Sequence, residues 1–250
     1  MARSLLAGIA ATTLVLLSGQ KASDTPDAKA ADSDGRYSYQ EEHDRFGIGK
    51  FYMGREIARV MSHRGISWLE RDTRQEEENL TKLIELLDLK SGETVADIGA
   101  GSGVITFMMA EKVGDEGTVY AVDIQPEMLD AIRTKAEKLG VDNVELVQGE
   151  TDDPKLPPGS TDLAVMVDVY HEFDVPFEML SAIVDGLKIG GRVAFVEYRK
   201  EDPAIPILEV HKMTEEQVKR EAAALDGRLK FIETKTELPR QHVILFERVK

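Results

Sequence analysis

The sequence predicts a doubly wound α/β fold, with a mostly parallel sheet and helices on both faces. Short apolar segments alternate with longer amphipathic ones along most of the chain, as in βαβ units. The run 163–167 is continuously apolar, which is typical of a central parallel strand covered on both sides. A glycine-rich loop at 99–103 joins one expected strand to the next helix.

The expected strands are short apolar runs bounded by turn residues. In chain order they cover 94–98, 118–123, 144–148, 163–167, 192–197, 231–234 and 243–248. Gly190-Gly191 forms the turn before the fifth of them, and the last two make a terminal pair.

The expected helices follow from apolar residues at helical spacing. They cover 76–89, 104–112, 127–139, 176–187 and 214–225. Ser91-Gly92 closes the first helix, Pro126 opens the third, and Thr214 with the glutamates after it starts the last. A further helix is expected to begin within 56–61.

Composition limits the function. The chain has 250 residues, 31 basic and 46 acidic, for a net charge of −15. Such a surface repels phosphate backbones, and no basic run offsets it, so no nucleic-acid partner is expected. With no cysteine, disulfides, thiolate metal sites and a cysteine nucleophile are excluded.

The chain begins with a segment that resembles a secretory signal, residues 1–22. Arg3 precedes the apolar run Leu5–Leu17, which is too short to cross a bilayer. Gln20 stands where a bacterial lipoprotein would carry its lipidated cysteine. We expect export to the periplasm, with the segment cleaved or kept as an anchor, and a cytoplasmic location if it is not functional.

Three regions follow this segment. Residues 23–36 are rich in Ala, Asp and Ser and are expected to form a disordered tether. Residues 37–75 are expected to form an N-terminal lid or helical extension, with Trp68, Glu70 and Arg71 over the site. Residues 76–250 are expected to form one catalytic domain.

The glycine loop carries the first functional signal. Its spacing is G-x-G-x-G, because Val104 occupies the last glycine position of the dinucleotide fingerprint. Asp97 directly before it suits a cationic or amine-bearing ligand better than a pyrophosphate. Asp123 ends the next strand, where an acid can accept hydrogen bonds from a ribose diol. The loop and both acids therefore converge at one sheet edge.

These residues resemble the class I S-adenosylmethionine-dependent methyltransferases. The matching segments are 95–103, Val122-Asp123, 149–153, 162–168 and 187–193. The resemblance implies a seven-stranded Rossmann-like sheet with one antiparallel strand, and S-adenosylmethionine as the methyl donor. Its methionyl end should lie over Gly99–Gly103 and its ribose on Asp123. The donor-binding residues expected are Asp97, Gly99, Ala100, Gly101, Gly103, Asp123, Ile124, Glu150, Thr151, Asp152 and Asp168.

One departure from the family pattern concerns the adenine. Many relatives carry Asp where this chain has Glu150. The acid that meets the adenine amine is therefore left open among Glu150, Thr151 and Asp152.

The acceptor side is expected at Tyr170-His171-Glu172, directly after the fourth strand. Methyl transfer is an in-line displacement that needs alignment and a free lone pair. His171 can act as general base or only brace the loop. Glu172 can orient His171, pair with an amine substrate or be structural, and Tyr170 can line the pocket. Glu197 and Tyr198 are candidates for the same wall.

No metal site is expected. His171, Glu172 and His211 could supply ligands, but no H-x-E or H-E-x-x-H spacing supports one.

The leading hypothesis is a methyltransferase acting on a small-molecule acceptor. The alternative is a non-catalytic binder of S-adenosylmethionine or S-adenosylhomocysteine. A nicotinamide-dependent oxidoreductase is disfavoured by Val104 and Asp97. A nucleic-acid methyltransferase is disfavoured by the charge, and by Asp168-Val169-Tyr170-His171 in place of an Asn/Asp-Pro-Pro-Tyr motif.

Overall fold

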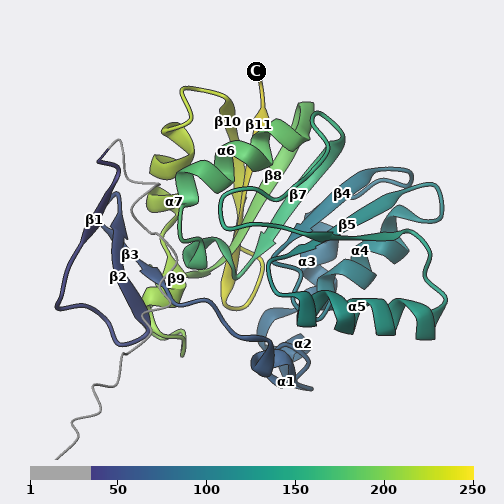
Figure 1. The fold of residues 1–250 in the computed structure, drawn as a ribbon, viewed down its shortest axis with the longest axis horizontal. Helices are drawn as coiled ribbons and strands as arrows, with labels where there is room; N and C mark the ends of the chain where they lie inside the picture. The colour runs from purple at the N-terminus through teal and green to yellow at the C-terminus, as the bar shows by residue number, and fades with distance from the viewer. Residues whose placement is uncertain (1–34) are drawn as a thin grey trace, which may run out of the picture. The chain divides into compact units, whose positions relative to one another are not determined.

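The computed structural model describes residues 35–250, shown as a ribbon in Figure 1. The signal-like segment and almost all of the expected tether lie outside the described residues. Within 35–250, no helix combines the length and the apolar character needed to cross a bilayer.

A mixed sheet forms the centre of the described chain. Its strands are β4 (Thr94–Ile98), β5 (Thr118–Asp123), β6 (Val144–Gln148), β7 (Thr161–Val167), β8 (Leu187–Arg199), β10 (Leu229–Lys235) and β11 (Gln241–Arg248). They lie in the order β10-β11-β8-β7-β4-β5-β6, and the two-residue β9 (Lys212–Met213) pairs with β8. Along this path β11 alone runs opposite to the other strands, because it pairs antiparallel with both β8 and β10. The doubly wound, mostly parallel sheet with one antiparallel strand is therefore confirmed.

Helices cover both faces of this sheet (Figure 1). On one face, α3 (Leu80–Leu86) and α4 (Val104–Val113) pack on alternate strand residues such as Val165, and α5 (Pro126–Leu139) covers β5. On the other, α6 (Pro176–Gly186) and α7 (Glu215–Ala223) pack on the intervening residues, such as Met166. This alternation is the two-residue period of a strand buried on both sides.

The helix expected at 76–89 is interrupted. The structure has α2 (Arg74–Glu78) and α3, separated by Asn79 in the left-handed conformation, with φ of 56°. The Asn79 side chain accepts a hydrogen bond from the Lys82 nitrogen at 3.1 Å and so caps α3. The apolar spacing is correct, but asparagine tolerates the break better than most residues.

The segment before α2 differs most from expectation. Residues 37–58 form a three-stranded antiparallel sheet of β1 (Tyr37–Tyr39), β2 (Gly47–Tyr52) and β3 (Arg55–Ala58). The helix expected to begin within 56–61 is therefore wrong. Met53-Gly54 between β2 and β3 has positive φ at both positions, which is the geometry of a two-residue hairpin turn. Short helices η1 (His63–Gly65) and α1 (Ile66–Leu69) follow.

A buried ion pair ties this small sheet to the main domain. Nε of Arg55 donates to Oε1 of Glu221 on α7 at 2.6 Å, and its Nη1 donates to the main-chain oxygen of His171 at 3.2 Å. The β3 strand thus braces the loop that follows β7.

Candidate active site

The glycine loop turns the chain sharply between β4 and α4. Gly99, Gly101 and Gly103 have φ of 72°, 56° and 80°, a region that favours glycine. Asp97, directly before the loop, is buried and accepts a hydrogen bond from Oγ1 of Thr106 at 2.6 Å. Burial raises the pKa of Asp97 to about 6. The loop therefore presents bare main chain beside a buried carboxyl.

Asp123 connects the glycine loop to the end of β5. Its Oδ2 accepts a hydrogen bond from the Gly101 nitrogen and its Oδ1 one from the Gln125 nitrogen, both at 2.9 Å. Burial raises its pKa, which these backbone donors oppose. Each carboxylate oxygen retains a second lone pair, so Asp123 can still accept from a ligand hydroxyl.

An open cavity of about 840 Å³, a volume that includes its solvent-filled mouth, lies at this edge of the sheet. The expected donor-binding residues that line it are Gly99, Gly101, Asp123, Ile124, Glu150, Thr151 and Asp168. Residues that follow β4, β5, β6 and β7 therefore line the same cavity.

The other expected donor residues lie elsewhere. Asp97 and Ala100 line a smaller adjoining hollow together with Arg74, which sequence reasoning did not single out. Gly103 begins α4 and lines neither space; a Cβ there would lie 2.9 Å from Ile132. Asp152 is not among the lining residues. Of the three candidates for the adenine amine, Glu150 and Thr151 are therefore the ones at the cavity.

Asp168 has an unusual environment at the end of β7. Its φ is 51°, and its Oδ2 accepts a hydrogen bond from Nε2 of Gln241 at 2.7 Å. Its Oδ1 is buried without a partner among the described residues. Burial raises its pKa well above the ordinary value. A buried acceptor without a donor, on a cavity wall, indicates a place for a ligand donor group.

Tyr170, His171 and Glu172 form the short helix η2 after β7. Tyr170 is fully buried, packs edge-to-face on Phe195 and Phe173, and does not line the cavity. Its ring belongs to the core, so the structure does not place it where it could contact an acceptor in the cavity. Of the three, Glu172 alone lines the cavity.

Glu172 joins the cavity to a pair of histidines. Its Oε2 accepts a hydrogen bond from the Met61 nitrogen at 3.3 Å. Burial raises the pKa of Glu172 to about 7. His171 is buried behind it, with Nδ1 2.6 Å from Oε2 of Glu197 and Nε2 3.1 Å from Nδ1 of His211.

Burial controls the charge of the groups around His171. It lowers the pKa of both imidazoles, His171 and His211, to about 4 and raises that of Glu197 to about 8. Both histidines are neutral near pH 7. Neither Glu197 nor Tyr198 lines the cavity: Glu197 lies behind His171, and Tyr198 donates to Oε1 of Glu78 at 2.7 Å.

The N-terminal segment completes the cavity wall. Val60, Met61 and Leu69 line it, whereas Trp68 is about half exposed beneath the guanidinium of Arg71. Sequence reasoning placed a lid here but chose Trp68, Glu70 and Arg71. Apolar residues in an irregular segment carry no periodic signal, so Val60 and Met61 were not identifiable.

Comparison with known proteins defines the class. A family model described as a methyltransferase domain matches residues 89–240, more than half of the chain. The crystal structure of an S-adenosylmethionine-dependent methyltransferase from Aquifex aeolicus matches 76% of this chain and all of its own, with a TM-score of 0.70 and 25% identity. The chain belongs to the class I S-adenosylmethionine-dependent methyltransferase family.

Two relatives with named acceptors match the sequence over shorter stretches. Aklanonic acid methyltransferase DauC of Streptomyces sp. strain C5 is 35% identical over 46% of this chain and 52% of its own. Nocamycin O-methyltransferase of Saccharothrix syringae is 37% identical over 33% of this chain and 29% of its own. The chain therefore spans about half or less of these curated relatives.

Proposed function

We propose that this protein transfers the methyl group of S-adenosylmethionine to a small-molecule acceptor. The observation that carries the proposal is that the glycine loop, Asp123 and Glu172 all line one cavity. The family supports the donor. The named relatives, which act on aklanonic acid and nocamycin, support a small molecule as the acceptor.

The residues at the donor end fit this ligand. S-adenosylmethionine, when bound, supplies a methyl group on a positively charged sulfur. The main chain at Gly99 and Gly101 lies open to its methionyl part, and Asp97 offers a carboxylate to its ammonium group. Asp123 accepts hydrogen bonds from the ribose hydroxyls. Ile124, more than a third exposed on the cavity wall, would pack against the adenine ring.

The acceptor side lies at the opposite part of the wall. Met61, Glu172, Phe173 and Met179 line the same cavity, and the two methionines offer flexible thioethers that adapt to irregular shapes. Alignment of the acceptor with the donor's methyl group, away from bulk water, accounts for most of the rate gain expected of such a site. The net charge of −15 disfavours a polyanionic acceptor.

A non-catalytic binder of the donor or of S-adenosylhomocysteine is the competing function. The observation that favours it is that His171, the expected base, is buried off the cavity wall. The two functions differ in turnover and not in donor binding.

A two-stage experiment tests the proposal. Calorimetry with S-adenosylhomocysteine should give saturable binding to the purified full chain. Donor labelled in its methyl group should then transfer label to at least one member of a panel of hydroxyl, amine and thiol compounds. Binding without transfer to any of them selects the binder, and absence of binding contradicts both functions.

A further inference from the structure

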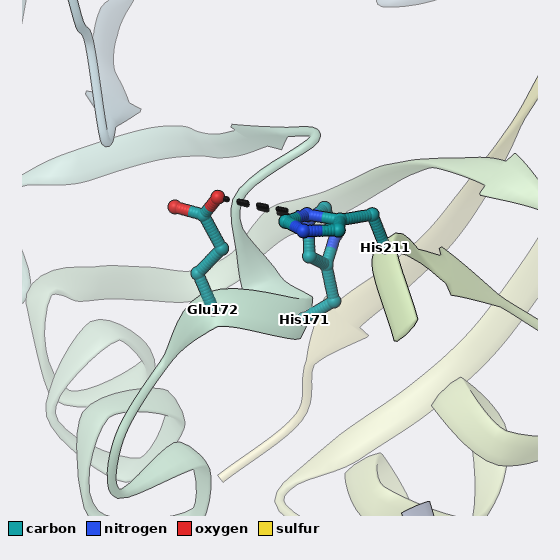
Figure 2. A group of neighbouring side chains, drawn as sticks. All are labelled: His171, Glu172 and His211. Carbon is teal, nitrogen blue, oxygen red and sulfur yellow. Dashed lines mark hydrogen bonds and ion pairs between the residues drawn. The ribbon is translucent and has the colours of Figure 1, made fainter. Parts of the chain in front are cut away.

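Three potential metal ligands meet beside the donor cavity, although they come from two distant parts of the chain. His171 and Glu172 belong to η2, and His211 ends the short helix η3 (Glu209–His211). Figure 2 shows their ring nitrogens and carboxylate directed toward one another. Their facing atoms all lie within 4.8 Å of each other.

The separations of these atoms match the size of a metal ion. Nε2 of His171 lies 3.1 Å from Nδ1 of His211 and 4.0 Å from Oε1 of Glu172, and the last two atoms are 3.8 Å apart. The nearest point that is equidistant from all three atoms lies in their plane, about 2.1 Å from each of them. Imidazole nitrogens and carboxylate oxygens bind Zn²⁺ at about 2.0–2.2 Å.

A second carboxylate orients His171 for this role. Oε2 of Glu197 faces Nδ1 of His171 at 2.6 Å, on the side away from the cluster. When Glu197 is ionised, it accepts the Nδ1 proton of His171, and the Nε2 lone pair then points at the other two ligands. A histidine held in this way by a carboxylate is the usual outer shell of a metal-binding imidazole.

The fold brings the two loops together through ordinary strand pairing. Lys212, next to His211, pairs with Tyr198, next to Glu197, in the β8–β9 ladder. The Asp168 nitrogen donates to the Val196 oxygen at 2.8 Å, which holds the start of the η2 loop against β8. The two histidines and Glu197 are thus positioned by one stretch of β8.

We propose that His171, Glu172 and His211 form a binding site for one divalent transition-metal ion, with Glu197 as the positioning residue of His171. Two imidazoles and one carboxylate suit Zn²⁺, Fe²⁺, Mn²⁺ or Co²⁺, whereas Mg²⁺ and Ca²⁺ prefer oxygen ligands alone. Three protein ligands leave coordination positions open to a further ligand.

The site indicates a substrate class. Of the three ligands only Glu172 lines the donor cavity, so a further ligand that reaches the metal from this side would be a hydroxyl or carboxylate oxygen of the acceptor. This role rests on the proposed function, whereas the metal site itself does not.

Metal binding is tested directly on the full-length chain after treatment with a chelator. Titration with Co²⁺ should produce a visible d–d absorption band that saturates at one ion per chain, and Zn²⁺ should abolish the band by displacement. Mg²⁺ should produce no competition. Absence of the band, or competition by Mg²⁺ as effective as that by Zn²⁺, overturns the proposal and leaves a hydrogen-bonded histidine pair.

Conservative variants assign the ligands. His211→Gln and Glu172→Gln should each weaken Co²⁺ binding at least 10-fold and alter the band, and Glu197→Gln should weaken it about 10- to 100-fold. His63→Gln is the matched control, because His63 also lies beside a carboxylate but outside the cluster. Its ring is 3.7 Å from the carboxylate of Glu127 on the surface. Unchanged Co²⁺ affinity in both ligand variants, or a loss in the control equal to theirs, contradicts the assignment.

A parallel measurement separates this proposal from the proposed function. S-adenosylhomocysteine binding by calorimetry should persist in the metal-free chain and in folded His211→Gln, since His211 does not line the donor cavity. A chain that binds this compound but not Co²⁺ contradicts the metal site alone. One that binds Co²⁺ but not this compound contradicts the proposed function alone.

Discussion

The side-chain amide of Gln125 holds the segment around Met61, which the sequence predicts to be part of a lid. Its Nε2 donates to the main-chain oxygen of Met61 at 2.9 Å, and its Oε1 accepts from the main-chain nitrogen of His63 at 2.8 Å. The backbone nitrogen of the same Gln125 donates to Asp123. One residue therefore couples this segment to Asp123, the acid proposed to bind the donor ribose.

Gln125→Ala should loosen the lid without unfolding the domain. Two hydrogen bonds at about 1 kcal/mol each correspond to a roughly 30-fold shift toward lid opening. Amide hydrogen exchange in residues 60–66 should accelerate accordingly. Gln40→Ala, an exposed glutamine, is the control and should leave that exchange unchanged. Equal protection of this segment in both variants would contradict the coupling.

Asp123→Ala should weaken S-adenosylhomocysteine binding by about 1–3 kcal/mol, the range for leaving hydrogen-bonding partners unpaired. Part of that loss arises because the Gly101 nitrogen, which donates to Asp123, loses its hydrogen-bond acceptor. Asp123→Asn retains one acceptor oxygen and should lose less. Calorimetry on both variants measures the difference, and unchanged affinity in Asp123→Ala would remove Asp123 from the ribose role.

The buried carboxyl of Asp97 should make the stability of the ligand-free protein depend on pH. Its pKa is raised to about 6 from 3.8, so the folded chain binds more protons than the unfolded chain between these values. This contribution to stability is complete below pH 3.8 and is lost as the pH rises through 6. Relative to Asp97→Asn, the wild type should lose on the order of 3 kcal/mol between pH 4 and pH 7.

Denaturant unfolding of both proteins across that interval measures this difference. Asp115→Asn, which changes an exposed acid, should follow the wild-type curve. A constant difference between wild type and Asp97→Asn at every pH would show that Asp97 does not titrate in this range.

Gly99→Ala should destabilise the protein for two separable reasons. The left-handed conformation costs about 1–2 kcal/mol for a residue with a side chain. In addition, the new Cβ would lie 2.5 Å from Cγ2 of Val169. Val169→Ala should remove the second part, so the double variant should lose less stability than the sum of the single variants.

Gly92→Ala provides the control for backbone strain alone. Its φ is 83°, and a Cβ there would meet nothing within 4 Å. Urea unfolding of all four variants gives the comparison. Strict additivity between Gly99→Ala and Val169→Ala would show that the steric contact does not matter.

The donor side of the site was largely predictable because its signals are local in sequence. Asp97 and Gly99 lie within three residues of each other at one strand end, and Asp123 ends the next strand. Parallel strands deliver their carboxyl ends to one edge, so strand assignment alone brings these residues together. Asp152 was offered because neighbouring loop residues cannot be distinguished without coordinates.

The acceptor side was less predictable because its contacts are distant in sequence. His211 meets His171 only through the pairing of β8 with β9, a two-residue strand with no periodic signal. The sequence has no H-x-E or H-E-x-x-H motif, and this absence argued against a metal site. The fold nevertheless brings His171, Glu172 and His211 together. Tyr170 was assigned to the pocket by adjacency, although η2 turns it into the core.

The contacts of Arg55 with Glu221 and His171 bear on how stable the two halves of the site are relative to each other. The proposed donor half draws on residues 97–168, whereas the proposed acceptor half rests on η2, which β3 and η3 contact from 116 and 40 positions away. Short helical turns and loops of this kind open at lower free energy than the central strands on which they rest. Mild heating or denaturant should therefore abolish binding of the methyl acceptor while the nucleoside portion of S-adenosylmethionine still binds.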